Sequence, residues 1–367
     1  MNQVSRIGVL IIAALMIAAC GNQAASTPTQ APAASTPTQA PAASTPTQAP
    51  AASTPTQAPA KLVVYSGRSE SLVGPFFTRF TEATGIPVEV RYGDTAELAA
   101  TILEEGANSP ADLFFAQDAG ALGALAAADV LIPLPTDILN QVEARFRSSD
   151  GRWVGISGRA RVVVYNTNKL TEADLPRSIT GFVDPQWRGR VGWAPTNGSF
   201  QAFITAMRVQ LGEEATRKWL EGMIANEVKT YERNAAIVQA VAAGEIDVGF
   251  VNHYYLYQLQ RQAGDTLPAA NYYPADGDVG ALINIAGVGI LKTAKNVAGA
   301  QRLIEYMLST DGQRYFAEQT FEYPLAGNVQ PDPRLKPLSE IQTPNIDLNQ
   351  LRDLQGTLQL LREVGAL

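Results

Sequence analysis

The feature that most limits the fold of this chain is a regular alternation of short apolar stretches with helical patterns over residues 61–367. The early part predicts strands at 62–65, 88–92 and 112–115 and helices at 72–84, 95–105 and 119–130. Short strands separated by helices of ten or so residues predict a mostly parallel sheet that is covered on both faces. We therefore expect an α/β fold.

A second unit of the same kind starts near Ser157. It predicts strands at 160–165, 191–194, 228–231 and 246–251, helices from Ser199, Glu213, Asn234 and about Tyr254, and then a late strand at 281–291 with a helix at 297–307. Two such units with a return strand predict two doubly wound lobes linked by crossing strands. The expected boundaries are 61–158 with about 285–335 for lobe 1, and about 159–284 with 336–367 for lobe 2. Ligands bind outside the carboxyl ends of strands in open α/β sheets, so the cleft between the lobes is the expected site.

Residues 1–60 precede this body and carry signals for export. Residues 1–19 join one cation to an apolar stretch too short to span a bilayer, which is typical of a signal peptide. Cys20 is the only cysteine, so an intramolecular disulfide and a cysteine-based metal site are excluded. The sequence Ile17-Ala18-Ala19-Cys20-Gly21 resembles the lipobox of bacterial lipoproteins, which predicts a lipid anchor at Cys20.

The segment between Cys20 and the body is a repeat. The unit Ala-Ala-Ser-Thr-Pro-Thr-Gln-Ala-Pro occurs in succession from Ala24 to Pro59. It contains no charge, no aromatic residue and no large aliphatic residue, so it has nothing with which to bury a core. We expect residues 20–60 to be a disordered tether.

Composition and motifs exclude two classes of function. The chain has 28 Lys and Arg against 35 Asp and Glu, a net charge of −7, which argues against nucleic acid as a partner. His253 is the only histidine, and no Gly-x-Ser-x-Gly, P-loop or His-Glu-x-x-His motif is present. We expect a binding protein rather than an enzyme, with His253 as a satisfied or an exposed side chain.

Three tyrosines are the candidate metal ligands. Tyr254 and Tyr255 directly follow the expected strand 246–251, and Tyr165 ends the expected strand that crosses into lobe 2. Hard oxygen donors suit hard cations, so an adjacent pair points to Fe³⁺. A tyrosine with a pKa near ~10 binds a cation by losing its proton, so binding should weaken in acid. The same residues can instead pack their rings and hydrogen-bond their hydroxyls, and the residues alone leave both interpretations open.

Two strand-to-helix turns carry donors suited to an anion. They are Ser66-Gly67-Arg68-Ser69 and Thr196-Asn197-Gly198-Ser199. Backbone N–H groups at a helix start, together with an arginine, can hold an anion. Asn234 is expected to begin another helix, and Arg159 and Arg161 add cations near Tyr165. Helix capping and surface ion pairs are the structural alternatives for each of these residues.

A set of short motifs, in order along 61–367, resembles the ferric-ion-binding proteins of bacterial iron ABC importers. They are Val64-Tyr65-Ser66-Gly67-Arg68, Glu104-Glu105-Gly106, Pro110-Ala111-Asp112, Ser157-Gly158-Arg159-Ala160-Arg161-Val162-Val163-Val164-Tyr165, Gln239-Ala240-Val241, Asn252-His253-Tyr254-Tyr255-Leu256-Tyr257, Gly280-Ala281-Leu282, Lys292-Thr293-Ala294-Lys295-Asn296 and Glu322-Tyr323-Pro324-Leu325. The resemblance implies a periplasmic-binding-protein fold whose two lobes close over the ion.

The resemblance also implies a set of iron ligands. Tyr254 and Tyr255 match the tyrosine pair of the family, and Tyr165 matches a third tyrosine used in some of its branches. The histidine and glutamate of the best-known branch are replaced by Ser69 and Gln117. This departure is similar to branches in which three tyrosines bind iron and an anion fills the remaining positions.

Two anion sites are implied, and the sequence does not choose between them. In one, carbonate is neutralised by Arg68, beside Ser69, with help from Arg161. In the other, a phosphate-like anion is held at positions that match Asn197, Gly198, Ser199, Asn234 and Asn252.

The resemblance implies partners and a location as well. They are an ABC permease with its ATPase, on the outer face of the cytoplasmic membrane, and a monomeric protein held there by lipid. The alternative is the same fold binding an organic anion or a polyamine in the cleft, because one fold hosts many ligands.

Overall fold

A computed structural model describes residues 60–264 and 266–367. The signal peptide, the lipidation of Cys20 and the repeat tether were predicted for residues that lie outside this described part, Ala60 excepted. Among the described residues, no helix is both long enough and apolar enough to cross a membrane.

The first part of the body is the expected alternation. Its elements are β1 (Leu62–Ser66), α1 (Glu70–Thr84), β2 (Val88–Tyr92), α2 (Thr95–Glu105), β3 (Leu113–Ala116), α3 (Ala119–Ala127) and the short α4 (Thr136–Leu139). Strand β1 lies between β2 and β3 and pairs with both in parallel. The helix expected over 119–130 is shorter and ends at Ala127, and Asp129 then takes a left-handed conformation with φ 58° that cannot continue a helix.

The second part repeats the pattern. Its elements are β5 (Val191–Trp193), α5 (Gly198–Leu211), α6 (Glu213–Ala225), β6 (Lys229–Thr230), α7 (Asn234–Ala242), β7 (Val248–Asn252) and α8 (Tyr254–Ala263). Strand β5 pairs in parallel with β6 and β7. All five residues of β7 are buried, as expected for a central strand with helices on both faces.

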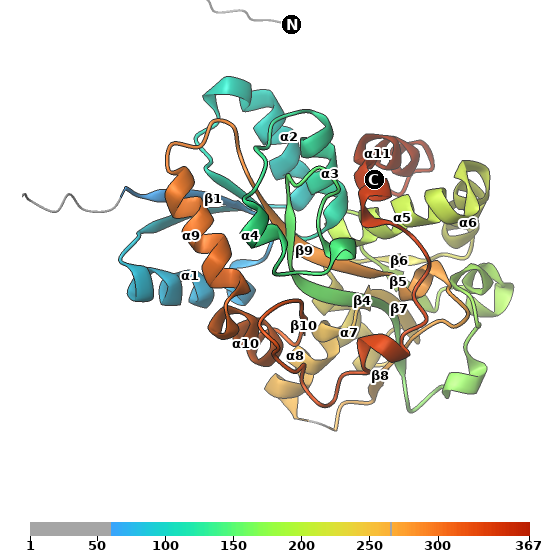
Figure 1. The fold of residues 1–367 in the computed structure, drawn as a ribbon. Coiled ribbons are helices and arrows are strands. Elements are labelled where there is room, and N and C mark those ends of the chain that lie inside the picture. The colour runs from blue at the N-terminus through green and yellow to red at the C-terminus, as the bar shows by residue number, and fades with distance from the viewer. Residues whose placement is uncertain (1–59, 265) are drawn as a thin grey trace, which may run out of the picture. The chain divides into compact units, whose positions relative to one another are not determined.

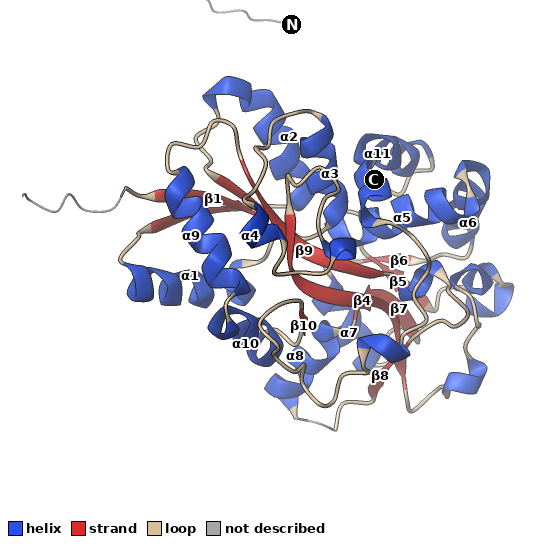
Figure 2. Cartoon of the chain, in the orientation of Figure 1, coloured by secondary structure: helices blue, strands red, loops and turns tan. Residues whose placement is uncertain are grey.

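Two long antiparallel strands join these parts. Strand β4 (Val154–Asn166) pairs with β9 (Ile283–Ile290) as far as Ala160, and from Arg161 onward it pairs with β7. The short strands β8 (Ala269–Tyr272) and β10 (Tyr323–Pro324) add to β4. The order β2-β1-β3-β9-β4-β7-β5-β6 therefore runs through one mixed sheet, with helices around it (Figures 1 and 2).

The rest of the chain packs around this sheet and its helices. It consists mainly of α9 (Val297–Leu308), α10 (Thr310–Gln319) and α11 (Leu354–Glu363). Helix α10 packs on α9 and α1, whereas α11 packs on α5 and α3 (Figure 1). The strand expected over 160–165 is the carboxyl half of the longer β4, which makes β4 the crossing strand that the sequence predicted.

Candidate metal-binding site

The tyrosine pair lies where β7 ends and α8 begins. Tyr254 is completely buried and Tyr255 is half-buried. Their ring centroids are 4.3 Å apart with the planes inclined by 35°. The Tyr254 hydroxyl is buried and has no hydrogen-bond partner among the described residues. Burial and the neighbouring Tyr254 raise the pKa of Tyr255 well above its usual value, so Tyr255 is neutral at pH 7 until a cation displaces its proton.

His253 fixes the start of α8 to the crossing strand. Its backbone N–H donates to the Ala160 carbonyl at 3.0 Å, and the Ala160 N–H donates to His253 Nδ1 at 3.1 Å. The other ring nitrogen, Nε2, lies 2.8 Å from the Phe321 carbonyl and must donate to it, so the proton is on Nε2. Burial lowers the pKa of His253 to about 4. His253 is thus a buried, satisfied side chain, which is one of the two alternatives that the sequence left open.

Tyr165 does not lie with the pair. In the ladder between β4 and β7, Tyr165 pairs with Val248 at the start of β7, whereas Arg161 pairs with Asn252 at its end. Four residues of strand at about 3.3 Å each separate these two levels by roughly 13 Å. Burial raises the pKa of the Tyr165 hydroxyl, and Glu172 raises it further. The structure therefore does not support Tyr165 as a ligand of an ion bound by Tyr254 and Tyr255.

Arg68 reaches the tyrosine pair from the turn between β1 and α1. Its guanidinium lies 5.8 Å from the centroid of the Tyr254 ring. It also donates two hydrogen bonds, at 2.7 and 2.8 Å, to the carboxylate of Glu322, and both side chains are buried. Sequence reasoning did not anticipate Glu322 as the partner of Arg68. The sequence analysis expected the positive charge of Arg68 to neutralise an anion. In the structure, the Glu322 carboxylate already balances that charge.

A cavity of about 470 Å³ opens beside Tyr255. Its lining includes Arg68, Ser69, Gln117, Asn197 and Tyr255. These residues come from both α/β parts, so the structure brings together the turns that the sequence had placed at strand ends.

Two of the other predicted anion-site residues, Ser199 and Asn234, donate hydrogen bonds to Asn197. The Asn197 side-chain oxygen accepts from the Ser199 backbone N–H at 3.1 Å, from the Ser199 hydroxyl at 2.5 Å and from Asn234 Nδ2 at 3.2 Å. Asn197 thereby caps α5. Asn252 is also buried, and its Nδ2 has no partner among the described residues. Most of these donors are therefore bonded to one another.

Gly198 lies against the first part of the body. A Cβ atom at this position would come within 2.8 Å of an Asp118 carboxylate oxygen and 3.1 Å of Thr95 Cβ. Asp118 also caps α3 by accepting from the Ala121 N–H at 3.0 Å. A carboxylate faces the start of α5, where the second predicted anion site would be.

Arg159, on β4, is one of the two cations that the sequence analysis placed near Tyr165. Its side chain is completely buried, and Nε, Nη1 and Nη2 all lack a hydrogen-bond partner among the described residues. Burial lowers the pKa of its guanidinium, and Tyr254 and Glu322 partly oppose that shift. Its place in an alternating strand beside Arg161 was visible in the sequence, but the absence of a partner was not.

Arg161 lies two residues along the same strand and points the same way. It donates to the Phe250 carbonyl at 3.0 Å and contacts the Ser199 hydroxyl at 3.4 Å. Burial and the like charge of Arg159 lower the pKa of Arg161 to about 9, so it remains charged at pH 7.

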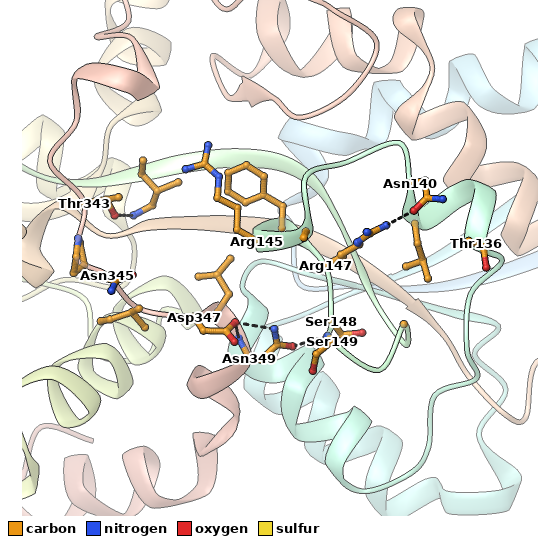
Figure 3. Close-up of a pocket in the computed structure, with 18 residues that line it drawn as sticks. Thr136, Asn140, Arg145, Arg147, Ser148, Ser149, Thr343, Asn345, Asp347 and Asn349 are labelled. Atoms are coloured by element: carbon orange, nitrogen blue, oxygen red, sulfur yellow. Dashed lines mark hydrogen bonds between the residues drawn. The ribbon is translucent and has the colours of Figure 1, made fainter.

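A larger cavity, of about 860 Å³, lies elsewhere (Figure 3). It is lined by segments 136–151 and 343–349 together with Ile283, and it contains none of the predicted site residues. Among the described residues, no group of three or more His, Cys, Asp or Glu side chains is placed to hold a metal ion.

Comparison with known proteins identifies the family to which this chain belongs. The family model described as bacterial extracellular solute-binding protein matches residues 108–352, so the chain belongs to that family. The major ferric iron-binding protein of Neisseria meningitidis serogroup A is 34% identical over 307 residues, which cover 83% of this chain and 92% of that protein.

Solved structures agree with this assignment. Iron-bound HitA from Pseudomonas aeruginosa superposes with a TM-score of 0.80 at 36% identity, covering 84% of this chain and all of that one. Trichodesmium IdiA (FutA), in complex with iron and citrate, gives a TM-score of 0.68 at 30% identity and covers 83% of this chain and 99% of that one. The predicted periplasmic-binding-protein fold and the resemblance to bacterial ferric-ion-binding proteins are confirmed. These relatives are binding proteins, which supports a role other than catalysis.

Proposed function

We propose that this protein captures ferric ion outside the cytoplasm through the phenolate oxygens of Tyr254 and Tyr255 and delivers it to an ABC permease and its ATPase. The observation that carries this proposal is the tyrosine pair itself, at the end of β7, with rings 4.3 Å apart beside a cavity lined by Tyr255 and Arg68. Phenolates are hard ligands suited to Fe³⁺. The names of the relatives support the same cargo.

Closure of two lobes over the ion is part of the proposal. Lobe 1 would comprise 61–158 with about 285–335, and lobe 2 about 159–284 with 336–367. Thr95 and Asp118 of lobe 1 lie against Gly198 of lobe 2, which is the kind of contact that hinge closure forms. An oxyanion such as carbonate or phosphate would complete the iron site. Lipid at Cys20 and the tether would hold a monomer near its permease, on the outer face of the membrane.

A visible absorption titration of the purified, iron-free protein with ferric nitrilotriacetate tests the proposal. We expect a new visible band, from ferric phenolate, that saturates at one iron per protein. Tyr254→Phe and Tyr255→Phe should each lose tight binding and keep the wild-type far-UV circular dichroism. Tyr165→Phe is the matched control and should retain the band. Absence of a band in the wild-type protein, or an unchanged band in both variants of the pair, would overturn the tyrosine assignment and favour an organic ligand.

A further inference from the structure

Helix α8 begins with the tyrosine pair, and other side chains at its start and along its length contact the carboxyl end of α10 (Figure 1). The donors are His253 at 2.8 Å, Gln258 at 3.1 Å and Arg261, whose guanidinium donates to two carbonyls, one of them at 3.1 Å. The acceptors are four consecutive backbone carbonyls, those of Glu318, Gln319, Thr320 and Phe321. We call this contact the α8–α10 junction.

The junction supplies what the end of α10 lacks. The last carbonyls of a helix have no partner within the helix. Helix α10, which the structure describes in full, has no basic side chain in its last turn. Arg261 of α8 provides the cation that this end of a helix dipole favours, and its guanidinium lies 4.2 Å from the centroid of the Phe321 ring. Helix α8 therefore caps α10, and Arg261 makes the largest part of the cap.

Phe321 has a backbone conformation that a bulky residue rarely adopts. Its φ is 58°, in the left-handed region, and its ring is buried. Such a conformation persists only where the surrounding contacts fix it. Here the Phe321 carbonyl meets His253, and the next residue, Glu322, reaches Arg68. The strain at Phe321 lets one short segment contact α8 and the turn after β1 together.

The two helices of the junction are fixed to different parts of the body. Helix α8 packs on α7 and β8, whereas α10 packs on α9 and α1. The Tyr315 hydroxyl of α10 also donates to the Leu72 carbonyl of α1 at 2.7 Å. The junction therefore joins the two lobes that we propose to close over iron.

The junction extends away from the crossing strand. His253 is bonded to Ala160, the residue at which β4 changes its partner from β9 to β7. At a rise of 1.5 Å per residue, Gln258 and Arg261 lie roughly 8 and 12 Å further along α8. A rotation of the lobes about β4 moves Arg261 further than His253, and so separates Arg261 from α10 first.

We propose that the α8–α10 junction is a latch that holds the closed protein on its bound iron, with Arg261 and Gln258 as the positioning residues that open and close it. This inference rests on the proposed iron-binding function, because the latch acts by keeping Tyr254 and Tyr255 in place and does not touch the metal. Arg261 is exposed, so the latch can break without leaving a charge buried and unpaired, as a reversible contact requires.

The rate of iron loss to excess EDTA, followed through the ferric-phenolate band, tests the latch. Arg261→Ala should raise the rate constant about tenfold, through loss of two charge-assisted hydrogen bonds at an exposed site. Gln258→Leu should raise it about threefold, through loss of one neutral hydrogen bond. Arg261→Lys should fall between Arg261→Ala and wild type, because an ammonium reaches the carbonyls without the planar fork. The wavelength of the band should not change, because both phenolates remain.

Thermal unfolding distinguishes a latch from a merely structural contact. Arg261→Ala should lower the Tm of the iron-loaded protein more than that of the iron-free protein, because weaker binding reduces the stabilisation that iron confers on the folded state. Arg188→Ala is the matched control. It removes an exposed arginine that donates to Glu227 at 3.0 Å within the second part of the body, and it should change neither the release rate nor the Tm difference.

An unchanged release rate in Arg261→Ala, or an equal loss of Tm with and without iron, would overturn the latch while leaving the iron site intact. Absence of the visible band in the wild-type protein would overturn the iron site and the latch with it. The two failures are therefore distinguishable.

Discussion

Arg68 and Glu322 form a completely buried, bidentate ion pair, with donor–acceptor distances of 2.7 and 2.8 Å. Burial acts against the charged form of each group, but each partner favours the charge of the other, so the pKa of Arg68 is raised and that of Glu322 is lowered. Thr320 adds a hydrogen bond to the carboxylate at 2.9 Å. The pair joins the turn after β1 to the segment after α10, directly under the Tyr254 ring.

Breaking this pair from one side should be costly. We expect Glu322→Gln to lower the free energy of unfolding by about 3–5 kcal/mol, because it leaves the Arg68 charge buried without a counter-ion. Urea unfolding of the iron-free protein at pH 7 measures the loss. The double variant Arg68→Met/Glu322→Leu should lose clearly less, since no charge is left unpaired. Equal losses in the single and double variants would show that packing, not charge, dominates.

The position of Tyr165 predicts a clear difference between tyrosine variants. Because β4 places it at the far end of β7, Tyr165→Phe should leave the apparent ferric affinity within about threefold of wild type, which is under 1 kcal/mol. Tyr255→Phe should lower it by at least about a thousandfold, through loss of one of two phenolate ligands. Competition with nitrilotriacetate, followed by visible absorption, measures both. A comparable loss in Tyr165→Phe would mean that the iron lies nearer to the crossing strand than we propose.

Most of the secondary structure could be predicted from the sequence because it is set locally. The apolar stretch of β3 and the Gly85 that ends α1 with φ 73° are read from a few neighbouring residues. The tyrosine pair was placed correctly for the same reason, since a strand end is a local feature. The register of β4 against β7 is not local, and the prediction for Tyr165 depended on it.

Long-range pairing also explains why the ion pair of Arg68 was not predicted. Its partner, Glu322, lies 254 positions away, and no spacing in the sequence connects them. Conversely, Arg159 looked like an ordinary member of a basic stretch, and only the packing of β4 beneath Tyr254 reveals that its guanidinium has no partner among the described residues. The partners of a side chain in a binding site depend on the packing around it, which local sequence patterns do not reveal.

Iron affinity should depend steeply on pH. Burial keeps the pKa of Tyr255 above its usual value, so the phenol is protonated throughout about pH 6 to 8. Each phenol that iron ionises releases one proton, so two ligands should raise the logarithm of the apparent affinity by about 2 per pH unit. Titrations corrected for the protonation of the competing chelator measure this slope. It should fall to about 1 in Tyr254→Phe, and a slope near zero in the wild-type protein would contradict phenolate binding.

The stability of the iron-free protein should carry a separate pH dependence from His253. Burial lowers its pKa from 6.5 to about 4, so the unfolded chain takes up a proton before the folded protein does. Stability attributable to His253 is therefore complete above about pH 6.5 and is lost as the pH falls toward about 4. A difference of about 2.5 pKa units corresponds to roughly 3 kcal/mol.

His253→Gln removes this titration. The variant should be less stable than wild type at pH 7, because an amide cannot reproduce both the Ala160 and the Phe321 hydrogen bonds with the ring's geometry. The difference in the free energy of unfolding between the wild-type protein and the variant should narrow as the pH falls from about 6.5 to 4.5. Only the wild-type protein loses the His253 contribution over that range. Urea unfolding at several pH values measures the gap, and other titrating groups cancel in the comparison. A gap that stays constant would mean that His253 titrates alike in both states, and that the neutral ring does not hold α8 to β4.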